Sequence, residues 1–326
     1  MPEYIVLGGQ KVGLGENKII NYDIARLPSG MMINMPVFIY RSKTDGPVLL
    51  LSGGLHGDEV NGIEIIRRMI AEQTFSNLFA GTVIAIPVLN VFGFLNYSRE
   101  VPDGKDVNRS FPGDANGSLA SRVAYHLTKN IIPLIDYGVD FHTGGAQRTN
   151  YPQMRYSVID KNSELIAKAF AAPFTLNSGL IPKSIRHQGS KMGKPIIVFE
   201  GGESMRFDEL SISEAIDGTK RLLCYLGMMN EKYQERKGVL LMDSSWVRAS
   251  RAGMFKPFID CGEPVVKNQP IGVINDPFGM YEIKVISKYD GFIIGMNNNP
   301  VVHQGDALFH IGLEKEKKSK SSAGEE

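Results

Sequence analysis

Between about residues 35 and 235, short apolar runs alternate with segments in which apolar residues recur every three to four positions. The apolar runs predict buried strands over residues 36–40, 47–54, 81–90, 137–145 and 194–202. The helical spacing predicts helices over residues 60–73, 118–134, 162–172 and 211–229, with N-caps at Ser118, at Asn162 or Ser163, and at Ser211. Because apolar strands that alternate with helices are covered on both faces, we expect an α/β fold with a mixed, mostly parallel sheet and helices on both faces.

After about residue 238 the pattern changes to short β-like runs separated by glycine, proline, asparagine and aspartate. This predicts a small all-β unit. We therefore expect a first domain over residues 1–240 and a β module over residues 241–313. Residues 314–326 are charged and almost free of apolar side chains, which predicts a disordered tail.

The composition narrows the class of protein by what it excludes. With a formal net charge of +1, the chain has no strong field for nucleic acid or an anionic membrane. Cys224 and Cys261 are its only cysteines, too few and too far apart for a disulfide framework or a cysteine zinc site. We see neither a signal peptide nor a run that approaches 18 apolar residues, and we expect a cytoplasmic protein.

Three polar motifs follow or end predicted strands: HGDE at residues 56–59, DFHTGG at 140–145 and FEGG at 199–202. In a sheet of this kind, functional side chains gather at the carboxyl ends of the strands. We therefore expect the three motifs, which lie far apart in the sequence, to meet at one rim.

The motifs together offer the side chains of a hydrolytic metal site. His56 and Glu59 lie on a glycine-rich loop and could face one point, although a His-x-x-Glu pair alone is a weak signal. His142 completes a His₂Glu set, which is a known catalytic zinc arrangement, and Asp140 could brace it. Glu200 follows four apolar residues, where a carboxylate is costly unless it is paired or functional, and could act as a general base.

A loop over residues 98–117 contains arginine, lysine and asparagine among proline, glycine and aspartate. Its neighbours Asn108 and Arg109 offer an amide and a planar guanidinium, which suit bidentate binding of a substrate carboxylate. A solvated surface arginine is the alternative interpretation.

The order of the motifs GGLHGDEVNG, DGKDVNRSFPG, DFHTGG and IIVFEGGE resembles the succinylglutamate desuccinylase/aspartoacylase family, which has the zinc carboxypeptidase-like fold. The resemblance covers about residues 45–230 and implies one zinc ion per chain, held by His56, Glu59 and His142. It implies Glu200 as the residue that activates the zinc-bound water, and Asn108 with Arg109 as the substrate-carboxylate pair. Arg99 is the candidate for polarising the scissile carbonyl and stabilising the oxyanion.

The resemblance also extends to the C-terminal module, which is similar to a biotinyl/lipoyl-type barrel sandwich. The turn NDPFGM at residues 275–280 has no lysine where such a carrier lysine would lie. We therefore expect a structural or oligomerising appendage, compatible with a homo-oligomer, and no covalently bound biotin or lipoate.

The leading hypothesis is a deacylase that hydrolyses the amide bond of a small, carboxylate-bearing N-acyl amino acid. Arg148 and Arg155, which follow the third proposed ligand, are candidates for binding a second anionic group of the substrate. A metallocarboxypeptidase and an ester deacylase would use the same residues, and cobalt or manganese could occupy the same ligand set. Outside the enzyme class, a non-catalytic ligand-binding protein is the alternative, although an intact set of four site residues counts against it.

Overall fold

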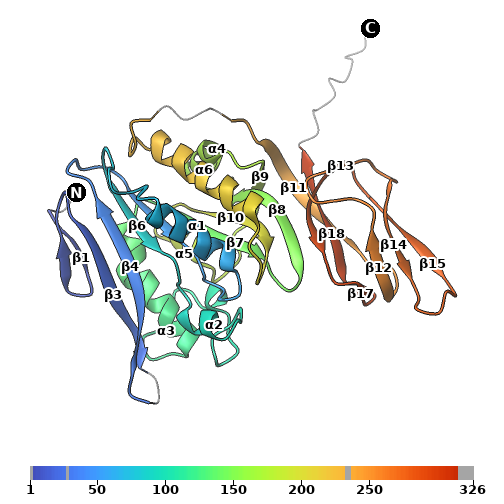
Figure 1. The fold of residues 1–326 in the computed structure, drawn as a ribbon, viewed down its shortest axis with the longest axis horizontal. Helices are drawn as coiled ribbons and strands as arrows, with labels where there is room; N and C mark the ends of the chain where they lie inside the picture. Colours follow the sequence, from blue (N-terminus) through green and yellow to red (C-terminus); the bar gives the residue numbers. More distant parts are fainter. Residues whose placement is uncertain (1–2, 27–28, 232–235, 315–326) are drawn as a thin grey trace, which may run out of the picture.

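A twelve-stranded sheet runs through the computed structural model, which describes residues 3–26, 29–231 and 236–314 (Figure 1). In sheet order its strands are β13 (Pro264–Val265), β16 (Gly291–Asn297), β18 (Ala307–Glu314), β11 (Val239–Arg248), β9 (Phe174–Asn177), β8 (Arg148–Tyr156), β10 (Ile196–Glu203), β7 (Tyr137–Gly144), β5 (Val48–Ser52), β6 (Thr82–Ile86), β4 (Met32–Arg41) and β3 (Asn17–Arg26). A separate hairpin joins β1 (Ile5–Leu7) to β2 (Gln10–Val12).

The sheet is mixed, as expected, and its parallel pairs lie in its central part. Strands β6, β5, β7 and β10 are parallel neighbours, as are β8, β9 and β11. Pairing is antiparallel between β8 and β10, among β11, β18, β16 and β13, and among β6, β4 and β3. The mixed α/β sheet is confirmed, but a predominance of parallel pairs is not.

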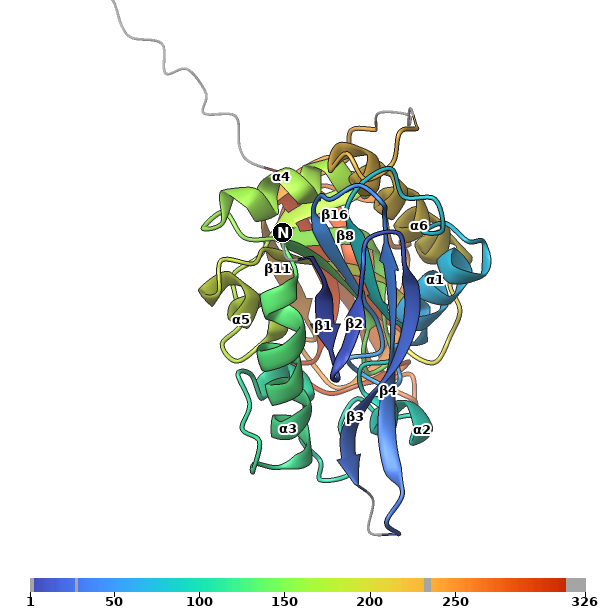
Figure 2. The same ribbon diagram turned by 90° about the vertical axis from the view of Figure 1, so that its left-hand side faces the viewer.

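Helices cover both faces of the central strands. Successive residues of a strand point to opposite faces, so each strand contributes to two apolar cores. Val48 and Leu50 of β5 pack in one apolar core with α3 (Leu119–His126) and α5 (Ile185–Lys191). Leu49 and Leu51 pack in the other core with α1 (Val60–Ala71), α4 (Lys161–Phe170) and α6 (Glu209–Tyr225). Figure 2 shows α3 and α5 on one side of the strands and α1 and α6 on the other. Strands buried on both faces explain why their sequences are apolar throughout.

The expected helix starts are confirmed in one case and wrong in two. Ser118 caps α3 by accepting a hydrogen bond from the Ser121 amide. Asp160 caps α4 and Asp208 caps α6, so the predicted serine and asparagine caps lie two to three residues too late. The predicted helix over residues 118–134 is also not continuous: α3 passes into a π-helical turn over Leu127–Ile131 and a 3₁₀ turn over Ile132–Leu134, which contains a proline.

Several elements were missed by the sequence analysis. They include the strands β1, β2, β3, β8 and β9, the short helix α5, the five-residue helix α2 (Val91–Leu95) and a 3₁₀ turn over Val107–Arg109. Among these, β8 is the most informative, because its sequence RTNYPQMRY is largely polar although most of the strand is buried or half-buried. A polar strand inside a protein indicates that its side chains have partners there.

Every element described between residues 239 and 314 is a strand. A four-stranded sheet has the order β15 (Glu282–Ile286), β14 (Pro270–Asn275), β12 (Gly253–Pro257) and β17 (Val301–Val302), and an apolar cluster that includes Phe255 and Phe309 packs within this region. The predicted boundary at residue 240 stays a prediction, since β11 pairs with β9 of the first region as well as with β18.

The β module is joined to the α/β region by a closed ring of strands. Strand β16 pairs with β18 and also with the first residues of β8, which closes the ring β8-β9-β11-β18-β16. A small apolar cluster of Phe174, Leu176, Leu241 and Ile294, with the partly buried Tyr151 packed against it, draws on four of these strands. Within the described residues, no helix is long and apolar enough to cross a membrane. Apart from Glu314, which ends β18, the predicted tail lies outside the described residues.

Candidate metal centre and active site

The three motifs found in the sequence meet at the carboxyl ends of β5, β7 and β10. These strands are parallel neighbours, so their ends lie at the same edge of the sheet. His56 and Glu59 lie on the loop after β5, His142 lies in the last part of β7, and Glu200 of β10 is the register partner of His142. The topology thus brings together residues that are up to 144 positions apart in the sequence.

The loop that carries His56 and Glu59 is packed too tightly for side chains at its glycines. A Cβ atom on Gly57 would lie 1.8 Å from the carbonyl carbon of Gly93, and Gly54 has a φ of +59°. Glu59 precedes α1 at the N-cap position, but its carboxylate makes no capping hydrogen bond there. Its side chain instead faces the two histidines.

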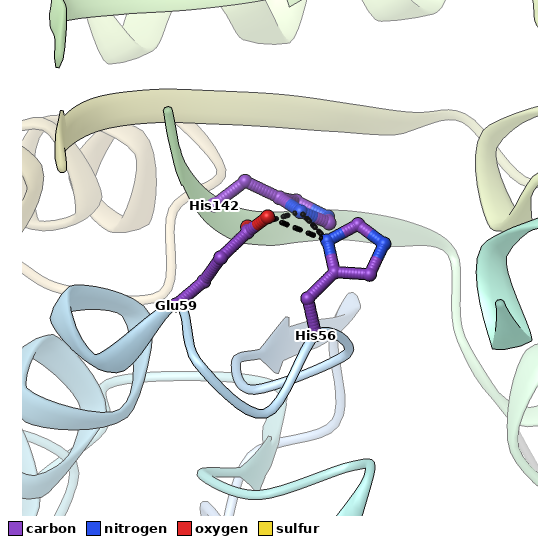
Figure 3. A group of neighbouring side chains, drawn as sticks. All are labelled: His56, Glu59 and His142. Atoms are coloured by element: carbon purple, nitrogen blue, oxygen red, sulfur yellow. Dashed lines mark hydrogen bonds and ion pairs between the residues drawn. The ribbon is translucent and has the colours of Figure 1, made fainter. Parts of the chain in front are cut away.

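His56, Glu59 and His142 are buried and converge on one point (Figure 3). Oε1 of Glu59 lies 2.7 Å from Nδ1 of His56, and Oε2 lies 2.8 Å from Nδ1 of His142. The two Nδ1 atoms are 3.2 Å apart. One ligand atom from each residue lies within 4.8 Å of the other two, which is close enough for all three to bind a single metal ion.

Carboxylates on the far side of both imidazoles explain why the Nδ1 atoms face inward. Nε2 of His142 lies 2.6 Å from Asp140, which also accepts a 2.7 Å hydrogen bond from the hydroxyl of Ser52. Nε2 of His56 lies 3.3 Å from Asp106. When Nε2 carries the proton and donates it to a carboxylate, Nδ1 keeps a lone pair, which is the state that a metal ligand needs. The donor set and its surroundings therefore fit a divalent ion.

The charges of the cluster shift the pKa values of its members. Burial lowers the pKa of His142, but the carboxylates of Asp140 and Glu59 outweigh this and raise it well above its usual value. Burial raises the pKa of Glu59, but the two histidines outweigh it and hold that pKa well below its usual value. Both shifts show that positive charge beside the Glu59 carboxylate stabilises the cluster.

Arg99 supplies part of that positive charge. Its Nη1 lies 3.2 Å from both Oε1 of Glu59 and Nδ1 of His56, and its other nitrogens bind the carboxylate of Asp106. Burial raises the pKa of Asp106, but His56 and Arg99 outweigh burial and lower it strongly. The structure therefore brings Arg99 to the cluster of His56, Glu59 and His142, and Asp106, which the sequence analysis did not single out, joins the two.

Glu200 lies beside the cluster and is held by two residues of β8. The amide nitrogen of Asn150 donates a 2.8 Å hydrogen bond to its Oε2, and Nη1 of Arg155 lies 3.4 Å from its Oε1. Asn150 is buried, while Glu200 and Arg155 are partly open. The carboxylate is thus fixed in orientation and still reachable.

A cavity of about 400 Å³ contains all of the predicted site residues. These are His56, Glu59, Arg99, Asn108, Arg109, His142, Arg148, Arg155 and Glu200. Asn108 is fixed because its Oδ1 accepts from the Ile185 amide, while Arg109 is exposed and donates to the Asn108 carbonyl. The Nε of Arg148 is buried without a hydrogen-bond partner among the described residues.

Among the other residues that line the cavity, the sequence analysis missed Asn150, Arg186 and Trp246. Arg186 is buried, and burial together with the nearby Arg155 lowers its pKa to about 10. Its guanidinium donates to the carbonyls of Ser178 and Gly179. The buried polar strand β8 could have indicated Asn150, but no sequence signal indicates that Arg186 or Trp246 reaches this cavity.

Comparison with known proteins gives a consistent assignment. Residues 45–226 match the family model described as the succinylglutamate desuccinylase/aspartoacylase catalytic domain. The N-alpha-acetyl-L-2,4-diaminobutyric acid deacetylase of Halomonas elongata is 27% identical, over 85% of this chain and 84% of its own. A product-bound ectoine utilization protein of Ruegeria pomeroyi has a TM-score of 0.82 at 23% identity, covering 91% of this chain and 95% of that one. A succinylglutamate desuccinylase/aspartoacylase of Rhodobacter sphaeroides also has a TM-score of 0.82, at 24% identity, covering 92% and 96%.

Proposed function

Because the chain belongs to the succinylglutamate desuccinylase/aspartoacylase family of hydrolases that act on linear amides, we propose that it is a zinc-dependent deacylase of small N-acyl amino acids or related carboxylate-bearing amides. The observation that carries this proposal is the convergence of His56, Glu59 and His142 in a cavity that also contains Glu200. A non-catalytic ligand-binding protein would need the cluster of His56, Glu59 and His142, but it would not need the accessible carboxylate of Glu200 in the same cavity.

His56 and His142 would hold the ion through their Nδ1 atoms and Glu59 through its carboxylate. When bound, a divalent ion at such a site polarises a carbonyl and lowers the pKa of a water molecule. Zinc is the ion that a buried His₂Glu set most commonly binds in hydrolases.

Glu200 would take a proton from the attacking water and pass it to the leaving nitrogen. Its hydrogen bond from Asn150 orients the carboxylate, and Nη1 of Arg155 lies 3.4 Å from its Oε1. Arg99, which is already directed toward the ligands, would donate to the oxygen that becomes negative as the carbonyl is attacked.

Asn108 and Arg109 would bind a carboxylate of the substrate. Since Oδ1 of Asn108 is occupied by the Ile185 amide, the Nδ2 group is the end that can donate to a ligand. Arg148, Arg155 and Arg186 line the same cavity and favour a second anionic group. The deacetylase of Halomonas elongata acts on an N-acetylated amino acid, which supports a substrate of this size and class.

Replacing Asp140 with asparagine should weaken zinc binding by about 10–100-fold, the usual cost of losing an outer carboxylate partner of a histidine ligand. The change keeps the size of the side chain but removes the charge that orients His142. Competition with a chromophoric chelator measures the affinity, and Asp136→Asn, which lies on the same chain segment outside the cavity, is the control. Unchanged affinity in Asp140→Asn would contradict the proposed role of Nδ1 as the His142 ligand atom.

Replacing Arg109 with glutamine should raise KM by about 10–100-fold, because a hydrogen bond between charged groups contributes about 1.5–3 kcal/mol. The expected effect on kcat is small, since the clamp would bind substrate and transition state alike. Lys105→Gln is a matched control on the same loop, exposed and outside the cavity. An equal effect of the two variants would indicate general electrostatic attraction instead of a carboxylate clamp.

The deciding experiment combines metal analysis of the purified protein with an assay on three panels: N-acyl amino acids, dipeptides and the matching esters. Hydrolysis of the first panel supports the deacylase. Preference for dipeptides would favour the carboxypeptidase, and preference for esters the ester deacylase. Absence of any bound divalent metal would overturn the proposal.

A further inference from the structure

One residue that lines the cavity comes from the β module. Trp246, the only tryptophan of the chain, lies on β11 and lines the cavity together with the residues of the α/β region. It is the only phenylalanine, tyrosine or tryptophan among the described residues that line it. Figure 1 shows β11 at the junction between the helices of the α/β region and the strands of the module.

The position of the indole is fixed by its strand partner. Trp246 pairs with His310 of β18, and the two rings stack with centroids 4.4 Å apart and an angle of 3° between their planes. Nε2 of His310 lies 2.8 Å from the hydroxyl of Ser244, which holds the imidazole from the same strand as Trp246. The indole is half-buried, so one part of it packs in the module and another part is available to a ligand.

The stacked indole and the proposed general base line the same cavity. Burial lowers the pKa of His310 to about 3, and the positive charge of Arg155 acts in the same direction. Arg155 in turn lies 3.4 Å from Glu200. Strand register carries the connection: Asn150, which donates to Glu200, is the register partner of Gly295 in β16, and Gly295 is in turn the register partner of His310. Because His310 pairs with Trp246, this series connects the indole to the Glu200 side of the cavity.

We propose that Trp246 is a specificity-determining residue that contacts the side chain of the amino-acid part of the substrate, and that His310 is a positioning residue that holds the indole in place. This inference rests on the proposed deacylase function, and it assigns the β module a part in substrate selection.

The chemistry of amide cleavage identifies which part of the substrate meets the indole. Glu200 must lie within hydrogen-bond reach of the leaving nitrogen to protonate it. The amino acid that carries this nitrogen therefore lies near Glu200, with its α-carboxylate directed to Asn108 and Arg109. Its side chain is then the part nearest Arg155 and Trp246, while the acyl group extends away from Glu200.

The surroundings of the indole also define the class of side chain. An indole offers a large, rigid apolar surface, which favours side chains with several carbon atoms. Arg148, Arg155 and Arg186 line the same cavity and oppose a cationic group. The expected substrate class is therefore an N-acyl amino acid whose side chain is long and uncharged or acidic.

The first test uses the fluorescence of the single tryptophan in the metal-loaded protein. Titration with N-acetyl-L-norleucine, or with L-norleucine as product, should change the intensity or wavelength of emission in a saturable manner, and N-acetylglycine should have less effect. This readout does not require turnover. If calorimetry shows saturable binding of these ligands but the tryptophan emission does not change, the proposed contact with Trp246 is wrong, even if the deacylase proposal holds. A saturable change in a protein that hydrolyses no panel member would support the contact while the deacylase proposal fails.

The second test compares variants by the ratio of kcat/KM for N-acetyl-L-norleucine to that for N-acetyl-L-alanine. Trp246→Ala should reduce this ratio at least about 10-fold, whereas Trp246→Phe should retain most of it. The ratio between N-succinyl and N-acetyl forms of one amino acid should change less than about 3-fold. A change in the acyl ratio alone would place the indole at the acyl group and overturn the assignment.

His310 is tested by loss and rescue. His310→Ala should reduce the norleucine-to-alanine ratio in the same direction as Trp246→Ala, and His310→Phe, which can still stack, should restore it. Phe258→Ala, an exposed change in the module outside the cavity, should leave the ratio unchanged. If His310→Ala alters only thermal stability and leaves both the ratio and the tryptophan emission at their wild-type values, the positioning role is wrong.

Discussion

Replacing Glu200 with glutamine is expected to reduce kcat by about 10²–10⁴-fold, which is the usual contribution of a general acid–base residue, while metal content stays at one ion per chain. Glutamine has nearly the same shape as glutamate but does not accept a proton at neutral pH. It can still accept the hydrogen bond from Asn150, so its side chain should remain in place. KM should change little, because the lost step belongs to the transition state and not to binding.

Glu203→Gln provides the matched control for this variant. Glu203 ends the same strand, is only slightly exposed and accepts a hydrogen bond from Asn298, but it does not line the cavity. Steady-state kinetics with metal analysis of both variants separates catalysis from metal binding. Normal turnover in Glu200→Gln, or an equal loss in Glu203→Gln, would show that the base has been assigned to the wrong residue.

The placement of Glu200 follows from features that a sequence can reveal. Nearly apolar strands predict a sheet buried on both faces, and the carboxyl ends of its parallel strands must lie at one edge. The structure brings HGDE, DFHTGG and FEGG together for this reason. Local patterns were sufficient here because each motif directly follows or ends an apolar strand.

The residues that hold Glu200 could not be assigned that role in the same way, although Arg155 was predicted as an anion-binding residue of the site. Asn150 and Arg155 lie on β8, whose polar sequence does not resemble a buried strand. These polar residues are tolerated because they contact Glu200 and the cavity, so the function of the strand removes the apolar signal that would have identified it. The N-caps of α4 and α6 were wrong for a simpler reason: an aspartate just before each predicted start was a better candidate than the serine within it.

Residues of the β module align one wall of the cavity through strand pairings that are far apart in sequence. Strand β8 pairs with β10, β9 and β16, so the residues of β8 that face the proposed base are aligned by the β module as well as by the α/β region. Asn150 is itself the register partner of Gly295 in β16. The prediction of the module as an appendage considered its own sequence alone and could not include this shared strand. Truncation of the β module should therefore raise KM as well as lower the free energy of unfolding.

Replacing His142 with alanine is expected to reduce zinc affinity by more than the roughly 10–100-fold that loss of an outer partner costs, because it removes one of three protein ligands. The variant also leaves the fully buried carboxylate of Asp140 with the Ser52 hydroxyl as its remaining hydrogen-bond donor. Removing one partner of a buried pair costs about 3–5 kcal/mol, so the variant should unfold at lower denaturant concentration. The double variant Asp140→Asn, His142→Ala removes that charge and should recover part of the stability without recovering metal binding.

His303→Ala, which replaces an exposed histidine in the module, is the control for both the zinc affinity and the unfolding measurement. A folded double variant that still binds one equivalent of zinc with wild-type affinity would rule out His142 as a ligand, and the proposed metal centre with it.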